Sequence, residues 1–133
     1  MKRWGLPGFV LLALCLGAVG CKAKLSADVK VDGAAFEPAS CRSGQVYGFS
    51  GVELTAKDGR KLRLVMRPDG QSEALLFPAN STTGTNLGAC GAFVVNQQNS
   101  SINDIKNVEG NATLSCSADG HSISGSVTFE NCH

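Results

Sequence analysis

This chain of 133 residues has few of the side chains on which most enzymes depend. It carries only two histidines, His121 and His133, which excludes a histidine-rich metal site and leaves little for general acid–base catalysis. The sequence contains no Gly-x-Ser-x-Gly turn, no Gly-x-x-x-x-Gly-Lys loop and no His-Glu-x-x-His pair. We therefore expect a protein that is not an enzyme and that binds no metal and no cofactor.

The chain also lacks an excess of positive charge. From residue 21 onward, ten Lys and Arg side chains stand against eleven Asp and Glu side chains. Proteins that hold nucleic acids by their phosphates need a basic surface. The charge balance therefore disfavours a nucleic-acid partner.

Helical periodicity is missing from the same stretch. Apolar residues do not recur at a spacing of three and four, whereas they alternate with polar residues in several short runs, such as the one from Leu25 to Val31. Twelve glycines after residue 20 supply frequent turns. The sequence predicts an all-β domain over residues 25–133, a small antiparallel β-sandwich or flattened barrel of about seven strands, braced by disulfides.

Residues 1–20 have the layout of an export signal. Two basic residues near the start precede an uncharged apolar run that ends at Gly20. The segment Ala18-Val19-Gly20-Cys21 resembles the lipobox of bacterial lipoproteins, although that family usually has Leu where this chain has Ala18. The resemblance implies that the signal is removed, that a diacylglycerol is joined to the sulfur of Cys21, and that residues 21–24 form a short tether.

Cysteine parity supports a lipidated Cys21. The alternative is an ordinary small-x-small cleavage site, after which Cys21 would begin a secreted protein. Five cysteines would then remain in an oxidising compartment, whereas four can pair completely if Cys21 carries lipid. Lys22 stands where lipoproteins kept in the inner membrane tend to have Asp. The resemblance therefore implies anchoring in the outer membrane of a bacterial envelope, with the domain facing the periplasm or the surface.

The clearest local prediction is a hairpin around Asp119-Gly120. This pair is preferred in a two-residue type I′ turn, because both positions need a positive φ. The turn places Ala118 opposite His121 and fixes the pairs that follow: Cys116 with Ile123, Leu114 with Gly125, Ala112 with Val127 and Gly110 with Phe129. The apolar residues of both strands then share one face, so the turn chemistry and the hydrophobic pattern agree.

Two further turns predict a three-stranded meander. Lys57-Asp58-Gly59 would join a strand over Val46–Ala56 to one over Arg60–Arg67, and Pro68-Asp69-Gly70 would join the second strand to a third. The expected pairs are apolar: Val52 with Leu64, Leu54 with Leu62, Leu64 with Ala74 and Leu62 with Leu76.

Two polar segments are predicted to be long loops and are the first places to look for function. One covers Pro78–Gly91. The other covers Asn96–Asn107 and is predicted to hold a helical turn near residues 101–106, just after the short apolar run Ala92–Val95.

Four cysteines are predicted to form two disulfides: Cys41, Cys90, Cys116 and Cys132. If the last strand runs straight, Cys132 lies opposite Asn107, about 30 Å along the strands from Cys116 at roughly 3.3 Å per residue. A disulfide does not span that distance, so Cys116 should pair with Cys41 or Cys90. Pairing Cys116 with Cys132 requires a bend near Gly125. The cysteines lack the close spacing of zinc ligands.

A basic stripe, Lys61, Arg63 and Arg67, is the one constellation with the chemistry of a binding site. These residues share one face of a predicted strand. If that face is exposed, they would bind an anionic glycan such as lipopolysaccharide or an acidic exopolysaccharide. The alternative is a solvated face on which acidic residues of the neighbouring strands balance the positive charge, since Glu53 is predicted opposite Arg63.

Taken together, these features predict a lipid-anchored binding or structural module of the cell envelope, such as an accessory subunit of a surface assembly. Its expected partners are the membrane, through the lipid, and an envelope protein or glycan. Two alternatives stay open: a lipoprotein that binds anionic glycans or lipopolysaccharide, and a small secreted enzyme inhibitor with a disulfide-braced loop.

Overall fold

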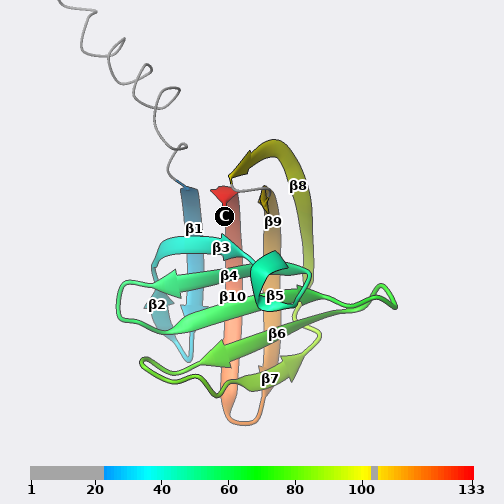
Figure 1. Cartoon of the computed structure of the whole chain (residues 1–133). Helices are drawn as coiled ribbons and strands as arrows, with labels where there is room; N and C mark the ends of the chain where they lie inside the picture. Colours follow the sequence, from blue (N-terminus) through cyan, green and yellow to red (C-terminus); the bar gives the residue numbers. More distant parts are fainter. Residues whose placement is uncertain (1–22, 103–104) are drawn as a thin grey trace, which may run out of the picture.

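The computed structural model describes residues 23–102 and 105–133, which form an all-β domain (Figure 1). Ten strands make two antiparallel sheets of five strands each, which confirms the predicted sandwich class. The predicted signal over residues 1–20 and the lipidated Cys21 lie outside the described residues. The first strand begins at Lys24, which pairs with Glu130, one residue before the predicted start of the domain at residue 25.

The two sheets contain different parts of the chain. The first sheet has the order β2 (Ala34–Phe36), β1 (Lys24–Val31), β10 (His121–Cys132), β9 (Ile105–Ala118), β8 (Ala92–Ile102). The second sheet has the order β3 (Pro38–Ser43), β4 (Gly51–Ala56), β5 (Lys61–Met66), β6 (Ser72–Phe77), β7 (Thr85–Gly88). Figure 1 shows the strands of the second sheet crossing in front of those of the first.

The hydrophobic core fills the space between the sheets, because alternate residues of each strand point inward. The largest fully buried apolar side chains come from both sheets: Val31, Phe36, Val52, Leu54, Leu62, Leu64, Leu114, Ile123 and Val127. Each contributes roughly 1.5–3 kcal/mol through removal of its surface from water. The apolar residues that alternate along the sequence are therefore the ones that pack between the two sheets.

The hairpin of β9 and β10 confirms the predicted register. His121 pairs with Ala118, Ile123 with Cys116, Gly125 with Leu114, Val127 with Ala112 and Phe129 with Gly110. Asp119 and Gly120 have φ values of 52° and 81°, as a type I′ turn requires. Beyond Phe129 a bulge shifts the pairing, so that Cys132 lies opposite Val108 rather than opposite Asn107 as predicted.

The meander of β4, β5 and β6 is also confirmed, with all four predicted apolar pairs. The predicted start of its first strand at Val46 was wrong. Gln45–Tyr47 form a 3₁₀ turn, η1, and β4 begins only at Gly51. Gly48 at φ 85° ends that turn in a left-handed conformation, which interrupts an extended strand.

Three strands were missed, which is why ten are present instead of about seven. The strands β2, β3 and β7 have three, six and four residues. β2 is too short to show a period of two, and β3 and β7 have too few apolar residues to show one. The predicted loop Pro78–Gly91 was therefore wrong in part, because β7 lies within it.

The second predicted loop, over Asn96–Asn107, was also wrong. Its described residues continue β8 to Ile102 and begin β9 at Ile105, so the predicted helical turn near residues 101–106 is replaced by strand. The pairing of β8 with β9 shifts between Gln97 and Ser101. The polar composition that suggested a loop thus belongs to an edge strand, which faces water along much of its length.

Two disulfides brace the sandwich. Cys41 of β3 is bonded to Cys132 of β10, and Cys90, which precedes β8, is bonded to Cys116 of β9. The predicted exclusion of a Cys116–Cys132 bridge is confirmed, and so is the pairing of Cys116 with one of the two earlier cysteines. The first bridge joins the two sheets, a link that hydrogen bonds within a sheet do not provide.

Candidate functional site

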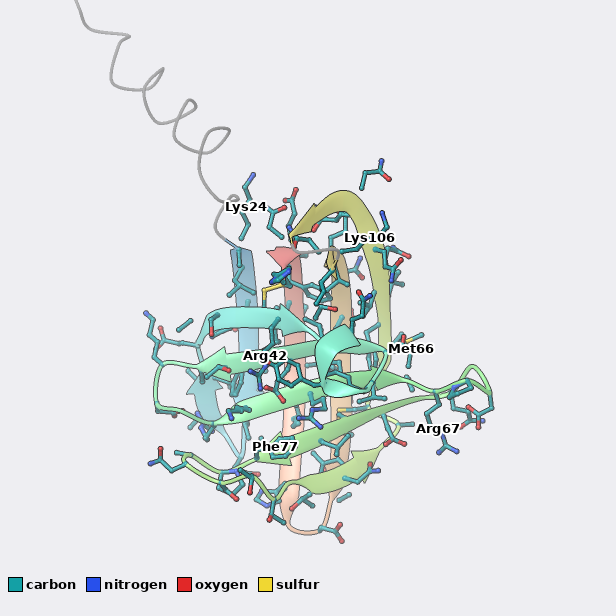
Figure 2. All side chains as sticks on the ribbon, viewed as in Figure 1. Lys24, Arg42, Met66, Arg67, Phe77 and Lys106 are labelled. Carbon is teal, nitrogen blue, oxygen red and sulfur yellow. A yellow bond between two sulfur atoms is a disulfide. The ribbon has the colours of Figure 1, made fainter. Side chains whose placement is uncertain are left out.

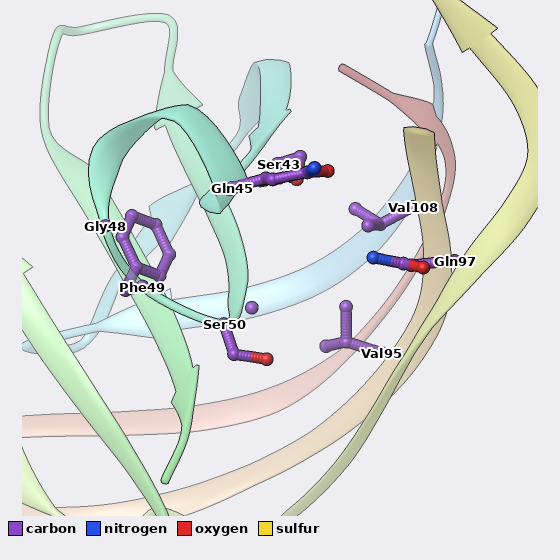
Figure 3. A pocket seen from close by; sticks show the side chains of 9 residues that line it. Ser43, Gln45, Gly48, Phe49, Ser50, Val95, Gln97 and Val108 are labelled. Atoms are coloured by element: carbon purple, nitrogen blue, oxygen red, sulfur yellow. Dashed lines mark hydrogen bonds between the residues drawn. The ribbon is translucent and has the colours of Figure 1, made fainter. Parts of the chain in front are cut away.

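A cleft of about 370 Å³ lies between the sheets at one end of the sandwich. We call it the end cleft. The end of β3, the turn η1 and the start of β4 form one wall, and β8 and β9 form the other (Figure 3). Its lining consists of Ser43, Gln45, Gly48, Phe49, Ser50, Gly51, Val95, Gln97 and Val108.

Glycines shape the wall that the second sheet provides. At Gly44 a Cβ atom would overlap the ring of Phe49, which folds back against this position. The N–H groups of Tyr47 and Phe49 both donate to the Gly44 carbonyl, at 2.9 and 3.1 Å. At Gly51, with φ 150°, a Cβ would overlap the Leu64 carbonyl. The chain therefore turns tightly between residues 44 and 51, on the side of the end cleft that faces β8.

The lining of the end cleft is neutral. No residue that lines it among the described ones carries a formal charge, and its apolar part comes from Phe49, Val95 and Val108. Ser43 is buried, with 2% of its surface exposed, and its hydroxyl accepts the Gln45 N–H at 3.2 Å. This surface suits an uncharged group with an apolar body and one or two hydrogen-bonding atoms.

The end cleft is not predicted by the sequence. Gln97 lies in the segment Asn96–Asn107, which the sequence predicts to be a functional loop, but the residue belongs to β8. The dense glycines between residues 44 and 51 were the available signal, since glycine is enriched where chains turn or approach closely.

The basic stripe is placed on the outer face of the second sheet. Lys61 and Arg63 point outward from β5, whereas Arg67 lies beyond the end of that strand. Arg67 contacts Asp69 at 3.3 Å and Glu73 at 3.5 Å. Lys61 has no ion pair within the described part of the chain. Anion binding by the stripe stays a prediction. It would depend on Lys61 and on the exposed atoms of Arg63 and Arg67, which already pair with carboxylates.

Arg63 belongs to a larger cluster that the sequence predicted only in part. Glu53 is opposite Arg63, as expected, but Arg42 of β3 lies on its other side. The Glu53 carboxylate is only 1% exposed and accepts bonds from both guanidinium groups, the closest at 2.7 Å on each side. Figure 2 shows Arg42 on this face, in the same view as Phe77.

Aromatic rings cover the same cluster. The Arg42 guanidinium lies 3.9 Å from the centre of the Tyr47 ring and donates to the Tyr47 hydroxyl at 2.9 Å. The Arg63 guanidinium lies 4.5 Å from the ring centre of Phe49 and 4.8 Å from that of Phe77. Cation–π contacts of this kind stabilise arginine side chains that are partly shielded from water. The cluster therefore ties η1 down onto the second sheet.

A contact between two turns involves His121, which the sequence did not assign to a site. Its Nδ1 atom lies 2.8 Å from Asp32 Oδ2, and the Ser122 N–H donates to Asp32 Oδ1 at 2.9 Å. The hydrogen bonds from His121 and Ser122 hold the pKa of the Asp32 carboxyl below its usual value. The Asp58 carboxyl has its pKa lowered by hydrogen bonds from Arg60.

Within residues 23–102 and 105–133, no helix is long and apolar enough to cross a membrane. Comparison with protein-family models, with curated proteins and with solved structures gives no match to this chain.

Proposed function

We propose that this chain is a lipid-anchored binding module of the bacterial cell envelope, held in the outer membrane through Cys21. The observation that carries the proposal is the arrangement of the domain directly after the lipobox-like segment. Strand β1 begins at Lys24, three residues after Cys21, so at most about 11 Å of chain separates the sulfur-bearing residue from the sandwich.

The strand that follows the proposed anchor is held from both sides. In the first sheet β1 lies between β2 and β10, and Lys24 pairs with Glu130. Two residues further along β10, Cys132 is bonded to Cys41 of the second sheet. A force on the lipid would therefore pass into both sheets at once. This arrangement suits a compact body that works close to the membrane.

The end cleft supports a binding role in preference to a chemical one. Its neutral lining offers hydrogen bonds and apolar contact but no acid, base or charged nucleophile among its residues.

Two or three acyl chains at Cys21 would anchor the domain stably, because each buried methylene contributes about 0.8 kcal/mol.

Labelling with radioactive palmitate in cells that express the full chain tests the anchor. We expect the parent chain to carry label and to sediment with membranes. The Cys21→Ser variant should lose the label and leave the membrane fraction. Cys15→Ser is the matched control, because it removes another cysteine of the same N-terminal region and should leave labelling unchanged. Label that persists in Cys21→Ser would contradict the proposal.

A further inference from the structure

The free edge of β8 lacks most of the features that usually protect a sheet from adding another strand. β8 pairs with β9 on one side and has no strand on its other side within the described part of the chain. It is eleven residues long and contains no charged residue and no proline. Native edge strands are usually short, charged, bulged, interrupted by proline or covered. The one irregularity of β8 is the register shift between Gln97 and Ser101, so residues 92–97 pair regularly with β9.

The other sheet edges of this domain do show such protection. β2 has three residues and β7 has four. β3 starts at Pro38, carries Arg42 and has a register shift at its beginning. Residues 92–97 of β8 therefore form the longest regularly paired edge of the two sheets that carries neither charge nor proline.

The end cleft lies beside this edge. Val95 and Gln97 of β8 line the cleft (Figure 3). Val94, which lies between Phe93 and Val95 in the alternation of the strand, is 48% exposed. A strand added along residues 92–97 would present its inward side chains near the cleft and its outward side chains near Val94. Edge and cleft together therefore form one binding surface.

We propose that β8 binds an extended peptide segment of a partner protein as a sixth strand of the first sheet, with an uncharged apolar side chain of that segment in the end cleft. The neutral lining of the cleft sets the charge of the bound side chain, because a charge buried there would find no partner. The inference rests on the proposed binding role and is independent of the lipid on Cys21.

A second copy of this chain fits the surface less well than an extended segment does. The inward side chains of a second β8 already belong to that copy's own fold: Phe93 is only 6% exposed and packs in the core, and Val95 packs against it. They are not free to enter a neighbour's cleft. An unstructured segment keeps the side chains of both its faces available. The occupant is therefore a tail or linker of another protein.

The test uses the full chain, purified as the cell makes it, and a seven-residue acetylated and amidated peptide that alternates Thr and Val. We expect saturable binding and slower amide hydrogen exchange in β8, since half of the amides of an edge strand point away from the sheet. Exchange in the other edge strands should not change. A peptide with Lys at its central inward position should bind about tenfold or more weakly, because its charge would enter the neutral cleft.

Two protein variants locate the binding. Gln97→Lys places a charge at the cleft, whereas Asn96→Lys adds the same charge to the outer face one residue earlier. Both side chains are exposed, so both variants should unfold at the urea concentration of the parent. Gln97→Lys should weaken peptide binding about tenfold, and Asn96→Lys less than about threefold.

Three results would overturn the proposal: no saturable binding of the peptide, equal weakening by the two variants, or a dimer of the parent chain that Gln97→Lys dissociates. The last result would show that a second copy occupies the edge. Palmitate labelling does not depend on any of these outcomes, so failure of the anchor and failure of the strand site are distinguishable.

Discussion

Glu53 shows at the scale of single residues how a charge is kept on a sheet face that is partly covered. Its carboxylate would cost several kcal/mol to bury alone, but it lies between Arg42 and Arg63. The rings of Tyr47 and Phe49 cover the arginines and exclude part of the water. The two guanidinium groups thus replace the water that would otherwise solvate the Glu53 carboxylate.

Substitution of Glu53 by Gln should lower the free energy of unfolding by about 2–3 kcal/mol. Removing one partner of a fully buried ion pair costs roughly 3–5 kcal/mol. The value here is smaller because the side chains of Arg42 and Arg63 are 39% and 26% exposed, so water can solvate them after the change. Urea denaturation at neutral pH measures the difference.

Glu73→Gln is the matched control for this prediction. Glu73 lies on β6 of the same sheet, is more exposed than Glu53, and contacts Arg67 at the longer distance of 3.5 Å. Its loss should cost less than about 1 kcal/mol, as for other surface pairs. Equal effects of the two substitutions would show that the buried position of Glu53 has no energetic role.

At the scale of elements, two Asp-Gly turns hold neighbouring hairpins together. Asp32-Gly33 joins β1 to β2 and has φ values of 55° and 82°, which match the turn at Asp119-Gly120. The first turn also donates the Asp32 N–H to the Ser122 carbonyl at 2.8 Å. An Asp-Gly dipeptide therefore marks the hairpin of β1 and β2 as well as that of β9 and β10. The sequence analysis predicts only the latter, because β2 has just three residues.

The carboxylate of Asp32 should make stability depend on pH. Because its pKa is lowered in the folded chain, the group stabilises the fold above its unfolded pKa of about 4. This contribution is lost as the pH falls through the folded-state pKa. Asp32→Asn should lower the free energy of unfolding at pH 7 by about 0.5 kcal/mol, a small value because the pair is exposed. The difference from the parent should shrink as the pH is lowered below about 4.

Asp119→Asn is the control for the pH effect, since Asp119 occupies the matching turn position and has no ion pair within the described residues. Asn tolerates a positive φ as Asp does, so neither change strains the turn. Urea denaturation at pH 7 and at a pH below 4 should show a larger pH-dependent difference for Asp32→Asn than for Asp119→Asn, because of these two only Asp32 contacts His121. The same pH response in both would contradict the role of the His121 pair.

For the whole molecule, the disulfides act on chain segments of very different length. The Cys41–Cys132 bridge joins residues 91 apart in sequence, and the Cys90–Cys116 bridge joins residues 26 apart. A bridge restricts the unfolded chain more when it closes a longer loop. The bridge between the sheets is therefore also the one that constrains the unfolded state more.

Removal of each bridge by a pair of Cys→Ala substitutions should reveal this order. Chain entropy predicts a loss of about 4.6 kcal/mol for Cys41–Cys132 and about 3.5 kcal/mol for Cys90–Cys116. Urea denaturation of the two double variants measures both values. If the Cys90–Cys116 variant is the less stable one, local packing around Cys90 dominates over chain entropy.

The all-β class, the C-terminal hairpin and the meander of β4, β5 and β6 are predictable from local sequence patterns. These features depend on interactions between neighbours along the chain: a turn dipeptide sets φ, and alternation sets which face is apolar. The same reasoning predicted that Glu53 faces Arg63, and it excluded one disulfide.

The way in which the two sheets meet is not predictable from such local patterns. The choice of Cys41 for Cys132, the approach of Arg42 to Glu53 and the end cleft between η1 and β8 all join residues far apart in the chain. β3 carries two of these residues but too few apolar ones to reveal itself as a strand. Such contacts form when buried surfaces stack, and stacking depends on the summed packing of both sheets instead of any local pattern.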